Sequence, residues 1–220
     1  MRKLSLCTLI IIMMIVISGF TYFGDEKSDK FDINDLYDYQ KEFKTEELSV
    51  CSTNTAKTYM DYRMTTLRSS RQYQFLNYEC TVDKKTGFLY DEEGFIAVAL
   101  GSYYGEIGDR FYFTLDTGIV LPLVKGEEKD DGDTDRTNCY HTIDGSVIEF
   151  VIDDEYAADY FGANGNGYVL NGNYNNYSLF EGSIVKVEKV LDEKSDKIVS
   201  YSVDTSVSTN IDMFNYASGY

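Results

Sequence analysis

The sequence predicts an all-β domain, and three observations lead to this prediction. Short runs with strand-like apolar patterns recur along the chain, and turn residues separate them. No strand alternates with a long helical pattern, as a βαβ fold would require. Hydrophobic residues make up 43% of the chain and aromatic residues 15%, which is enough to build a packed core. Together these features are typical of a small barrel or sandwich.

The first predicted element is an N-terminal hydrophobic helix. Arg2 and Lys3 precede an uncharged run over residues 4–24, whose centre at residues 9–17 contains only Leu, Ile, Met and Val. A basic start followed by an apolar run is typical of a secretory signal or a signal anchor. Counted over residues 4–23, the run is long enough to span a membrane. We expect a single N-terminal anchor in the cell membrane with the domain outside; the alternative is a cleaved signal and a secreted protein.

The chain divides into four predicted segments. Residues 1–24 form the signal anchor or signal peptide, and the strongly charged residues 25–54 form a juxtamembrane stalk with a short helix capped by Asp32 or Asn34. The β domain follows at residues 55–192. Residues 193–220 supply a closing strand and a loose tail.

Seven runs in the chain have strand character. The run at residues 95–100 is continuously apolar, which indicates a strand buried on both faces. Pro122 cannot donate a ladder hydrogen bond, so we expect its strand at a sheet edge or leaving the sheet there. The seven runs are residues 57–65, 95–100, 110–116, 119–124, 145–153, 183–191 and 198–203.

Charge and cysteine content narrow the class of protein. The net charge is −17, and such a field disfavours nucleic acid as a partner. Cys7 lies in the hydrophobic segment, which leaves Cys51, Cys80 and Cys139 outside it. An odd number leaves at least one thiol unpaired within the monomer, and the sequence does not decide which pair forms a disulfide.

The most concentrated feature is the acidic run Glu127–Asp135. Asp131, Asp133 and Asp135 stand at alternate positions, the spacing that opens an EF-hand calcium loop. The glycine and the final glutamate that an EF-hand also requires are missing, so we expect no EF-hand. Looser calcium binding through these three aspartates stays open, and we expect no other cofactor.

The same run has two further interpretations. Crowded carboxylates raise one another's pKa, and such a carboxyl can act as a general acid in glycoside cleavage. A solvated loop that keeps the protein soluble is the plainer alternative. His141 is the only histidine and lies in no recognisable nucleophile motif, so neither a catalytic triad nor a zinc site is expected.

The stretch from about Thr58 to Leu191 resembles a known group of proteins. Its sharpest segments are GSYYGEIGDRFYFTLDTG, the run KGEEKDDGDTDRTN and DGSVIEFVID. They resemble exported proteins of Gram-positive bacteria and their phages. That group is similar to the 3D-domain and RlpA-like double-psi β-barrels of cell-wall lytic transglycosylases and expansin-like proteins.

The resemblance implies a small six-stranded double-psi-like β-barrel with the acidic loop at a groove. It implies that Asp133 or Asp135 protonates the glycosidic oxygen, that a sugar hydroxyl then closes onto the anomeric carbon, and that Asp153 is a second groove residue. Two functions follow. The first is a peptidoglycan-cleaving enzyme similar to lytic transglycosylases. The second is a non-catalytic wall module that binds peptidoglycan, another cell-wall glycan or calcium through the same loop.

Overall fold

A computed structural model describes residues 32–191 of the chain. The N-terminal hydrophobic segment and the predicted strand at residues 198–203 lie outside this range. Among the described residues, no helix has the length and apolar character needed to cross a membrane.

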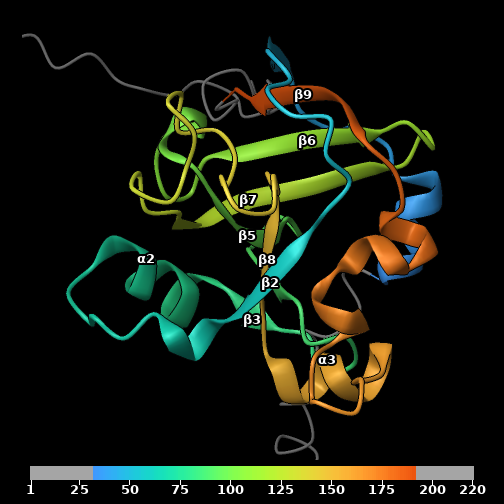
Figure 1. Cartoon of the computed structure of the whole chain (residues 1–220). Helices are drawn as coiled ribbons and strands as arrows, with labels where there is room; N and C mark the ends of the chain where they lie inside the picture. Colours follow the sequence, from blue (N-terminus) through green and yellow to red (C-terminus); the bar gives the residue numbers. More distant parts are fainter. Residues whose placement is uncertain (1–31, 192–220) are drawn as a thin grey trace, which may run out of the picture.

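The described chain is built around one mixed sheet (Figure 1). Its main path runs in the order β1-β9-β6-β7-β5-β4-β3, while β2 joins through β8, which also pairs with β5. Two pairs are parallel, β5 with β7 and β2 with β8. Within the described residues these pairings leave an open sheet. Most of the regular structure belongs to this sheet, so the prediction of a β-rich fold is confirmed. The strands are β1 Thr45–Leu48, β2 Thr58–Asp61, β3 Thr81–Val82, β4 Leu89–Tyr90, β5 Ile96–Leu100, β6 Arg110–Leu115, β7 Val120–Glu128, β8 Glu149–Ile152 and β9 Ile184–Val190.

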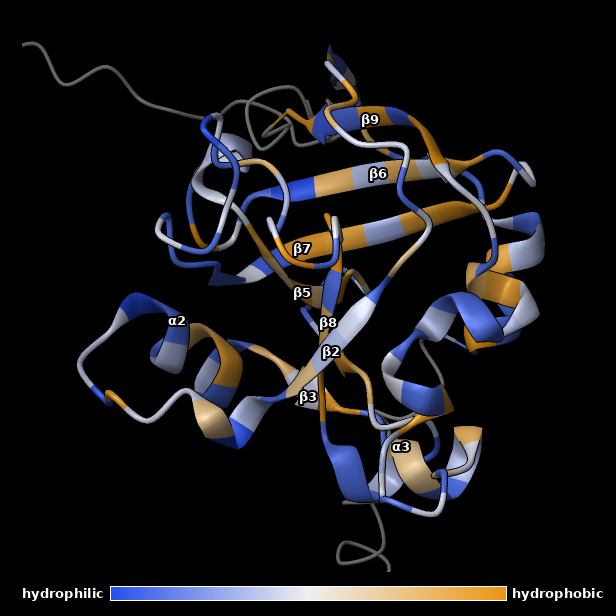
Figure 2. Ribbon diagram, viewed as in Figure 1, coloured by the Kyte–Doolittle hydropathy of each residue, from blue (hydrophilic) through white to orange (hydrophobic). Residues whose placement is uncertain are grey.

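The strand β5 explains why the sheet has apolar packing on both faces. Its residues alternate between two hydrophobic clusters: Ile96 and Val98 belong to the larger one, Ala97 and Ala99 to the smaller one. All four are fully buried, as the continuous apolar run predicted. Figure 2 shows the hydrophobic colour concentrated on β5 and β7 in the middle of the sheet.

The helical segments are short and lie around the sheet. The segment α2 continues directly into η3, and this pair covers the smaller cluster through Phe75 and Leu76. The longest helix among the described residues is α3, which begins after the N-cap Asp153 and ends at Phe161, before Gly162, where φ is +81°. The segments are η1 Ile33–Asp38, η2 Tyr62–Met64, α2 Arg71–Gln74, η3 Phe75–Glu79, η4 Ser102–Tyr104, α3 Asp154–Phe161, η5 Leu170–Gly172, η6 Tyr174–Asn176 and η7 Ser178–Phe180.

The described part of the expected stalk packs on the domain. Asp32 caps η1 as predicted, but Ile33 and Leu36 are buried in the larger cluster because both side chains face the sheet. The strand β1 then pairs antiparallel with β9. Residues 32–54 are therefore part of the folded unit, which begins before residue 55.

The prediction of an edge strand at Pro122 was wrong for the strand as a whole, although Pro122 itself has a neighbouring strand on one side only. Its strand β7 lies inside the sheet, between β6 and β5. Proline is tolerated there because β5 pairs with β7 only from Leu123 onward, so Pro122 lies where β7 has a neighbour on one side.

One disulfide joins Cys51 to Cys139, across 88 positions of sequence. Cys80 is the free thiol among the described residues and is partly buried. The hydroxyl of buried Tyr104 contacts both bridged sulfurs, at 3.4 Å from Cys51 and 3.1 Å from Cys139. The disulfide therefore ties the acidic loop to the chain segment before β2.

Candidate functional site

The aspartates of the acidic loop differ in their surroundings. Asp131 and Asp133 are exposed, and the Asp131 carboxylate accepts a 2.8 Å hydrogen bond from the Ser102 hydroxyl. The backbone oxygen of Asp133 accepts hydrogen bonds from the amide and the hydroxyl of Thr142, beside an isolated antiparallel bridge between Thr134 and His141. Their carboxylates therefore lie at the protein surface.

Asp135 holds the turn together. Its carboxylate accepts hydrogen bonds from the amides of Thr137, Cys139 and Tyr140, at 2.9, 2.7 and 3.1 Å, and from the Thr137 hydroxyl. Burial alone raises the pKa of Asp135, but these donors outweigh it and hold the pKa well below its usual range. A carboxyl that stays ionised in this way is a poor proton donor.

Asp153 lies at the opposite end of β8 from the acidic loop, where α3 begins (Figure 1). Its carboxylate accepts hydrogen bonds from the amides of Glu155 and Tyr156, at 3.2 and 3.4 Å, and so caps the helix. The structure does not bring Asp153 together with Asp131, Asp133 and Asp135.

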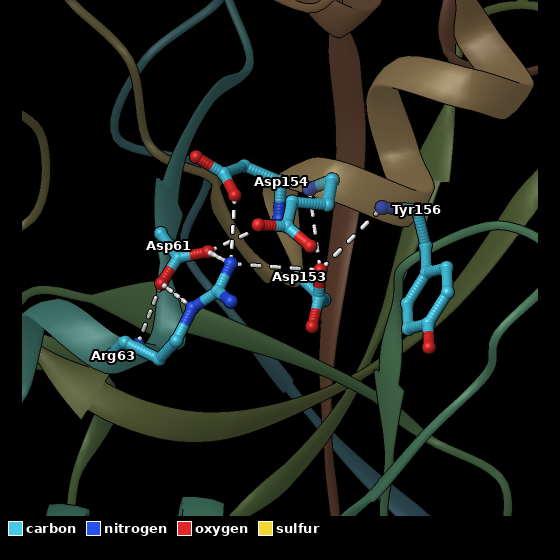
Figure 3. Close-up of polar contacts among 6 residues, drawn as sticks. Asp61, Arg63, Asp153, Asp154 and Tyr156 are labelled. Carbon is cyan, nitrogen blue, oxygen red and sulfur yellow. Dashed lines mark hydrogen bonds and ion pairs between the residues drawn. The ribbon is translucent and has the colours of Figure 1, made fainter.

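Instead, Asp153 meets Asp61 and Asp154, which the sequence did not single out. One oxygen from each of these three carboxylates lies within 4.8 Å of the others. Figure 3 shows the guanidinium of Arg63 among them. One of its nitrogens lies 2.7 Å from Asp61, 2.7 Å from Asp154 and 3.5 Å from Asp153.

The position that a metal ion would take in this cluster is thus held by Arg63. Burial raises the pKa of Asp61, but hydrogen bonds from Arg63 and from the amide of Asp154 outweigh it and lower the pKa to about 2. The cluster joins the end of β2 to the start of α3 and acts as a charge-paired structural network.

Two further carboxylates, Glu127 and Glu149, lie on the smaller-cluster face of the sheet. Strand β7 carries a bulge there: Val98 of β5 faces Lys125 and Ala99 faces Glu127, which leaves Gly126 as the extra residue. Without that residue the alternation of the strand would turn Glu127 to the other face. With it, Glu127 shares the face of Ala99.

A second glutamate stands on the other side of the same alanine. Glu149 of β8 pairs with Ala99 of β5, so Glu127, Ala99 and Glu149 form one row across three strands. Paired residues of neighbouring strands point to the same face, so the two glutamates flank the small side chain of Ala99, which is itself fully buried. The amide of Gln72 on α2 donates a 3.2 Å hydrogen bond to Glu127.

This environment gives Glu127 a perturbed acidity. Burial first, and then the nearby charge of Glu149, raise the pKa of Glu127 from 4.5 to about 7. The carboxyl is therefore largely protonated at pH 6 and still partly protonated at neutral pH. A carboxyl poised near neutral pH beside a second carboxylate is the usual arrangement of a general acid and its partner.

Lys129 completes this group. Its ammonium donates hydrogen bonds to the backbone oxygen and the hydroxyl of Ser146, both at 3.2 Å, and lies 3.9 Å from the Glu149 carboxylate. Burial lowers the pKa of Lys129, against the attraction of the nearby carboxylates. Lys129 thus places a positive charge beside Glu149, and the same charge lowers the pKa of Glu127 against the larger effects of burial and of Glu149.

The sequence predicts a carboxyl with a raised pKa in the acidic run, but that prediction named the aspartates as candidate acids and missed Glu127. Glu127 is the first residue of that run. Its burial follows from the pairing of β7 with β5, and the spacing of the aspartates does not reveal this pairing. Glu149 did leave a signal in the sequence, because it is a single carboxylate inside the apolar run VIEFVI.

We compared the chain with protein-family models, with curated proteins and with solved structures. No family model matches it. No curated protein and no solved structure matches it either.

Proposed function

We propose that this chain is an exported, cell-wall-associated protein that cleaves a wall glycan, with Glu127 as the general acid. The observation that carries the proposal is the row of Glu127 and Glu149 on either side of Ala99, with the pKa of Glu127 raised to about 7. Two residues that are two strands apart have backbones about 10 Å apart. Glycoside-cleaving enzymes place their two carboxyls roughly 5–10 Å apart.

The reaction proposed is that of a lytic transglycosylase. Glu127 gives its proton to the glycosidic oxygen, and the bond from that oxygen to the anomeric carbon breaks. A hydroxyl of the same sugar then bonds to the anomeric carbon, and its proton passes to the Glu149 carboxylate. The products are a free sugar end and a 1,6-anhydro end. Atoms and charge balance without a cofactor.

Two further observations support the cellular setting and the finer fold. The Cys51–Cys139 disulfide is typical of proteins outside the cytoplasm, in agreement with the basic and apolar N-terminus. We propose a membrane-anchored location, with secretion as the alternative. We also propose kinship with double-psi barrels, supported by the two parallel pairs, β5–β7 and β2–β8, within a mixed sheet.

The test is clearing of purified peptidoglycan sacculi by the full chain in a detergent without a sugar head group. Glu127→Gln and Glu149→Gln are compared with Asp133→Asn and with Asp135→Asn. We expect Glu127→Gln to lower the rate by about 100-fold or more, and the wild-type products to carry 1,6-anhydro ends. Full activity of Glu127→Gln, or loss in Asp133→Asn alone, would move the acid back to the loop.

A second function is favoured by the exposure of Asp131 and Asp133 on a loop held by the disulfide. This is a non-catalytic wall module that binds glycan or calcium through the loop. Folded protein that pellets with sacculi without clearing them would support it. If calcium is the ligand, the ion should strengthen this binding, and Asp131→Asn with Asp133→Asn should abolish that effect.

A further inference from the structure

A hollow of about 280 Å³ lies on the smaller-cluster face, between η3 and the turn that joins β4 to β5. It is lined by Phe75, Tyr78, Glu79, Asp91, Glu92 and Arg110. Glu92 also lines an adjoining hollow of about 330 Å³. Each is near the lower limit of ligand pockets, roughly 300 Å³. The first hollow therefore has room for one small ring, and the second for an extension of it.

The polar wall of this hollow is fixed in place. Arg110 donates a 2.6 Å hydrogen bond to Asp91, whose side chain is only 2% exposed. The other carboxylate oxygen of Asp91 accepts hydrogen bonds from the amides of Glu93 and Phe95, at 3.0 and 2.9 Å. The guanidinium lies over the Phe95 ring, 5.6 Å from its centroid. A planar donor held in this way can bind a hydroxyl or carbonyl oxygen with little loss of side-chain freedom.

The opposite wall is aromatic. Tyr78 is 74% exposed although it is a large ring, and it forms an edge-to-face contact with Tyr73, with centroids 6.1 Å apart. Such a ring offers an apolar face with a polar end. A sugar ring has the matching surfaces, because its axial C–H groups form an apolar face and its hydroxyls project from the rim.

The charges in the hollow favour a neutral ligand over an ion. Of its three carboxylates, Asp91 is paired with Arg110, and Glu79 is paired with Arg71 in an ion pair beside the hollow. Only Glu92, whose side chain is 71% exposed, is left with a distant partner at 3.8 Å. A free anion would meet uncompensated Glu92, and a cation would compete with two arginines already in place.

We propose that this hollow binds one pyranose unit of a neutral N-acetylhexosamine chain, with Tyr78 as the stacking surface and Arg110 as the hydrogen-bond donor. The choice of sugar rests on the proposed function. Arg110 lies two residues before Tyr112 of the smaller cluster, so it shares the sheet face of Glu127. The hollow and the proposed acid thus lie on the same face of the sheet, both beside the covering segments α2 and η3.

Chitotetraose is titrated into the full chain carrying Glu127→Gln, in a detergent without a sugar head group. Binding affinity is measured by calorimetry. Tyr78→Ala should weaken binding at least tenfold, whereas Tyr78→Phe, which keeps the ring, should bind within about twofold. Tyr168→Ala is the matched control, because Tyr168 is also exposed and lies on a different loop. Circular dichroism confirms that each variant is folded.

Two results would overturn the subsite. One is equal affinity of Tyr78→Ala and Tyr168→Ala, and the other is no binding of millimolar chitotetraose by folded protein. Either result can occur while Glu127→Gln still abolishes clearing of sacculi, in which case the proposed acid stands and only the subsite fails. Binding that depends on Tyr78 in a chain with no clearing activity would instead support the subsite and refute the catalysis.

Discussion

Glu127 and Asp135 belong to the same acidic run, yet their surroundings drive their acidities in opposite directions. Asp135 receives several hydrogen bonds to its charged form, whereas burial and the charge of Glu149 disfavour the charged form of Glu127. If Glu127 is the acid, activity requires its protonated form. We expect the rate of sacculus clearing to fall as the pH rises through about 7. A rate that stays constant from pH 6 to 8.5 would contradict this assignment.

The raised pKa of Glu127 also predicts how the stability of the protein depends on pH. The folded-state pKa of Glu127, about 7, lies above its ordinary value of 4.5, so the folded state binds the proton more tightly. Its contribution to stability is complete below pH 4.5 and is lost as the pH rises through 7. Glu127→Gln cannot lose this contribution. From pH 5 to pH 8, we expect the free energy of unfolding of Glu127→Gln, relative to that of the wild type, to rise by on the order of 2 kcal/mol, allowing for partial exposure.

Urea unfolding of both proteins at pH 5 and pH 8 measures this difference. Asp133→Asn is the control. Because the Asp133 side chain is exposed, we expect this variant to respond to pH as the wild type does. An equal response of Glu127→Gln and wild type to pH would show that Glu127 titrates normally in the folded protein.

At the scale of elements, the position of Glu127 depends on the bulge at Gly126. A Cβ at this residue would lie 2.8 Å from Cδ2 of Leu76 and 3.3 Å from Cβ of Ala97. The leucine end can move by a few tenths of an ångström, but a larger side chain would push α2 and η3 off the sheet. We expect Gly126→Val to destabilise the protein by about 1–3 kcal/mol and to disturb the contact of Gln72 with Glu127.

Thermal unfolding of Gly126→Val and Gly126→Ala measures this cost. Gly94→Ala is a useful comparison, because its φ is +85° but no atom lies within 4 Å of an added Cβ. A loss in Gly126→Val no larger than in Gly94→Ala would mean that the helical cover adapts freely.

The N-cap of α3 offers a separate prediction. Asp153→Ala removes the acceptor for the amides of Glu155 and Tyr156 and one partner of Arg63. We expect a loss of about 1–2 kcal/mol in the free energy of unfolding. Asp153→Asn keeps a capping oxygen and should lose less. If both variants reduced sacculus clearing without affecting stability, Asp153 would have a catalytic role instead.

The elements that local patterns encode could be predicted from the sequence. The run at residues 95–100 became β5, buried on both faces, and Asp32 caps η1. One failure came where a local side-chain cap decides. The run at residues 57–65 reads as one strand, but β2 ends at Asp61 because that carboxylate turns back to bond the amide and side chain of Arg63.

At the scale of the whole molecule, the candidate site combines segments that are distant in sequence. Gln72, Ala99, Glu127 and Glu149 come from α2, β5, β7 and β8, and no local pattern places them together. The sequence predicts a raised pKa from crowding within the acidic run, whereas at Glu127 burial is the main cause and Glu149, from another strand, is the second. Which carboxyl it is follows only from the bulge and from the order of the strands.

The pairing of the cysteines also depends on the whole fold, and it predicts an effect on stability. The Cys51–Cys139 disulfide closes a loop across 88 positions that contains β2 through β7, so it restricts the unfolded chain strongly. We expect the double variant Cys51→Ser with Cys139→Ser to lose about 2–5 kcal/mol of unfolding free energy. Reductant should lower the melting temperature of the wild type but not of this variant. Cys80→Ser, which removes the free thiol, is the control and should keep the response to reductant. A reductant effect that persists in the double variant would show that another thiol pair is responsible.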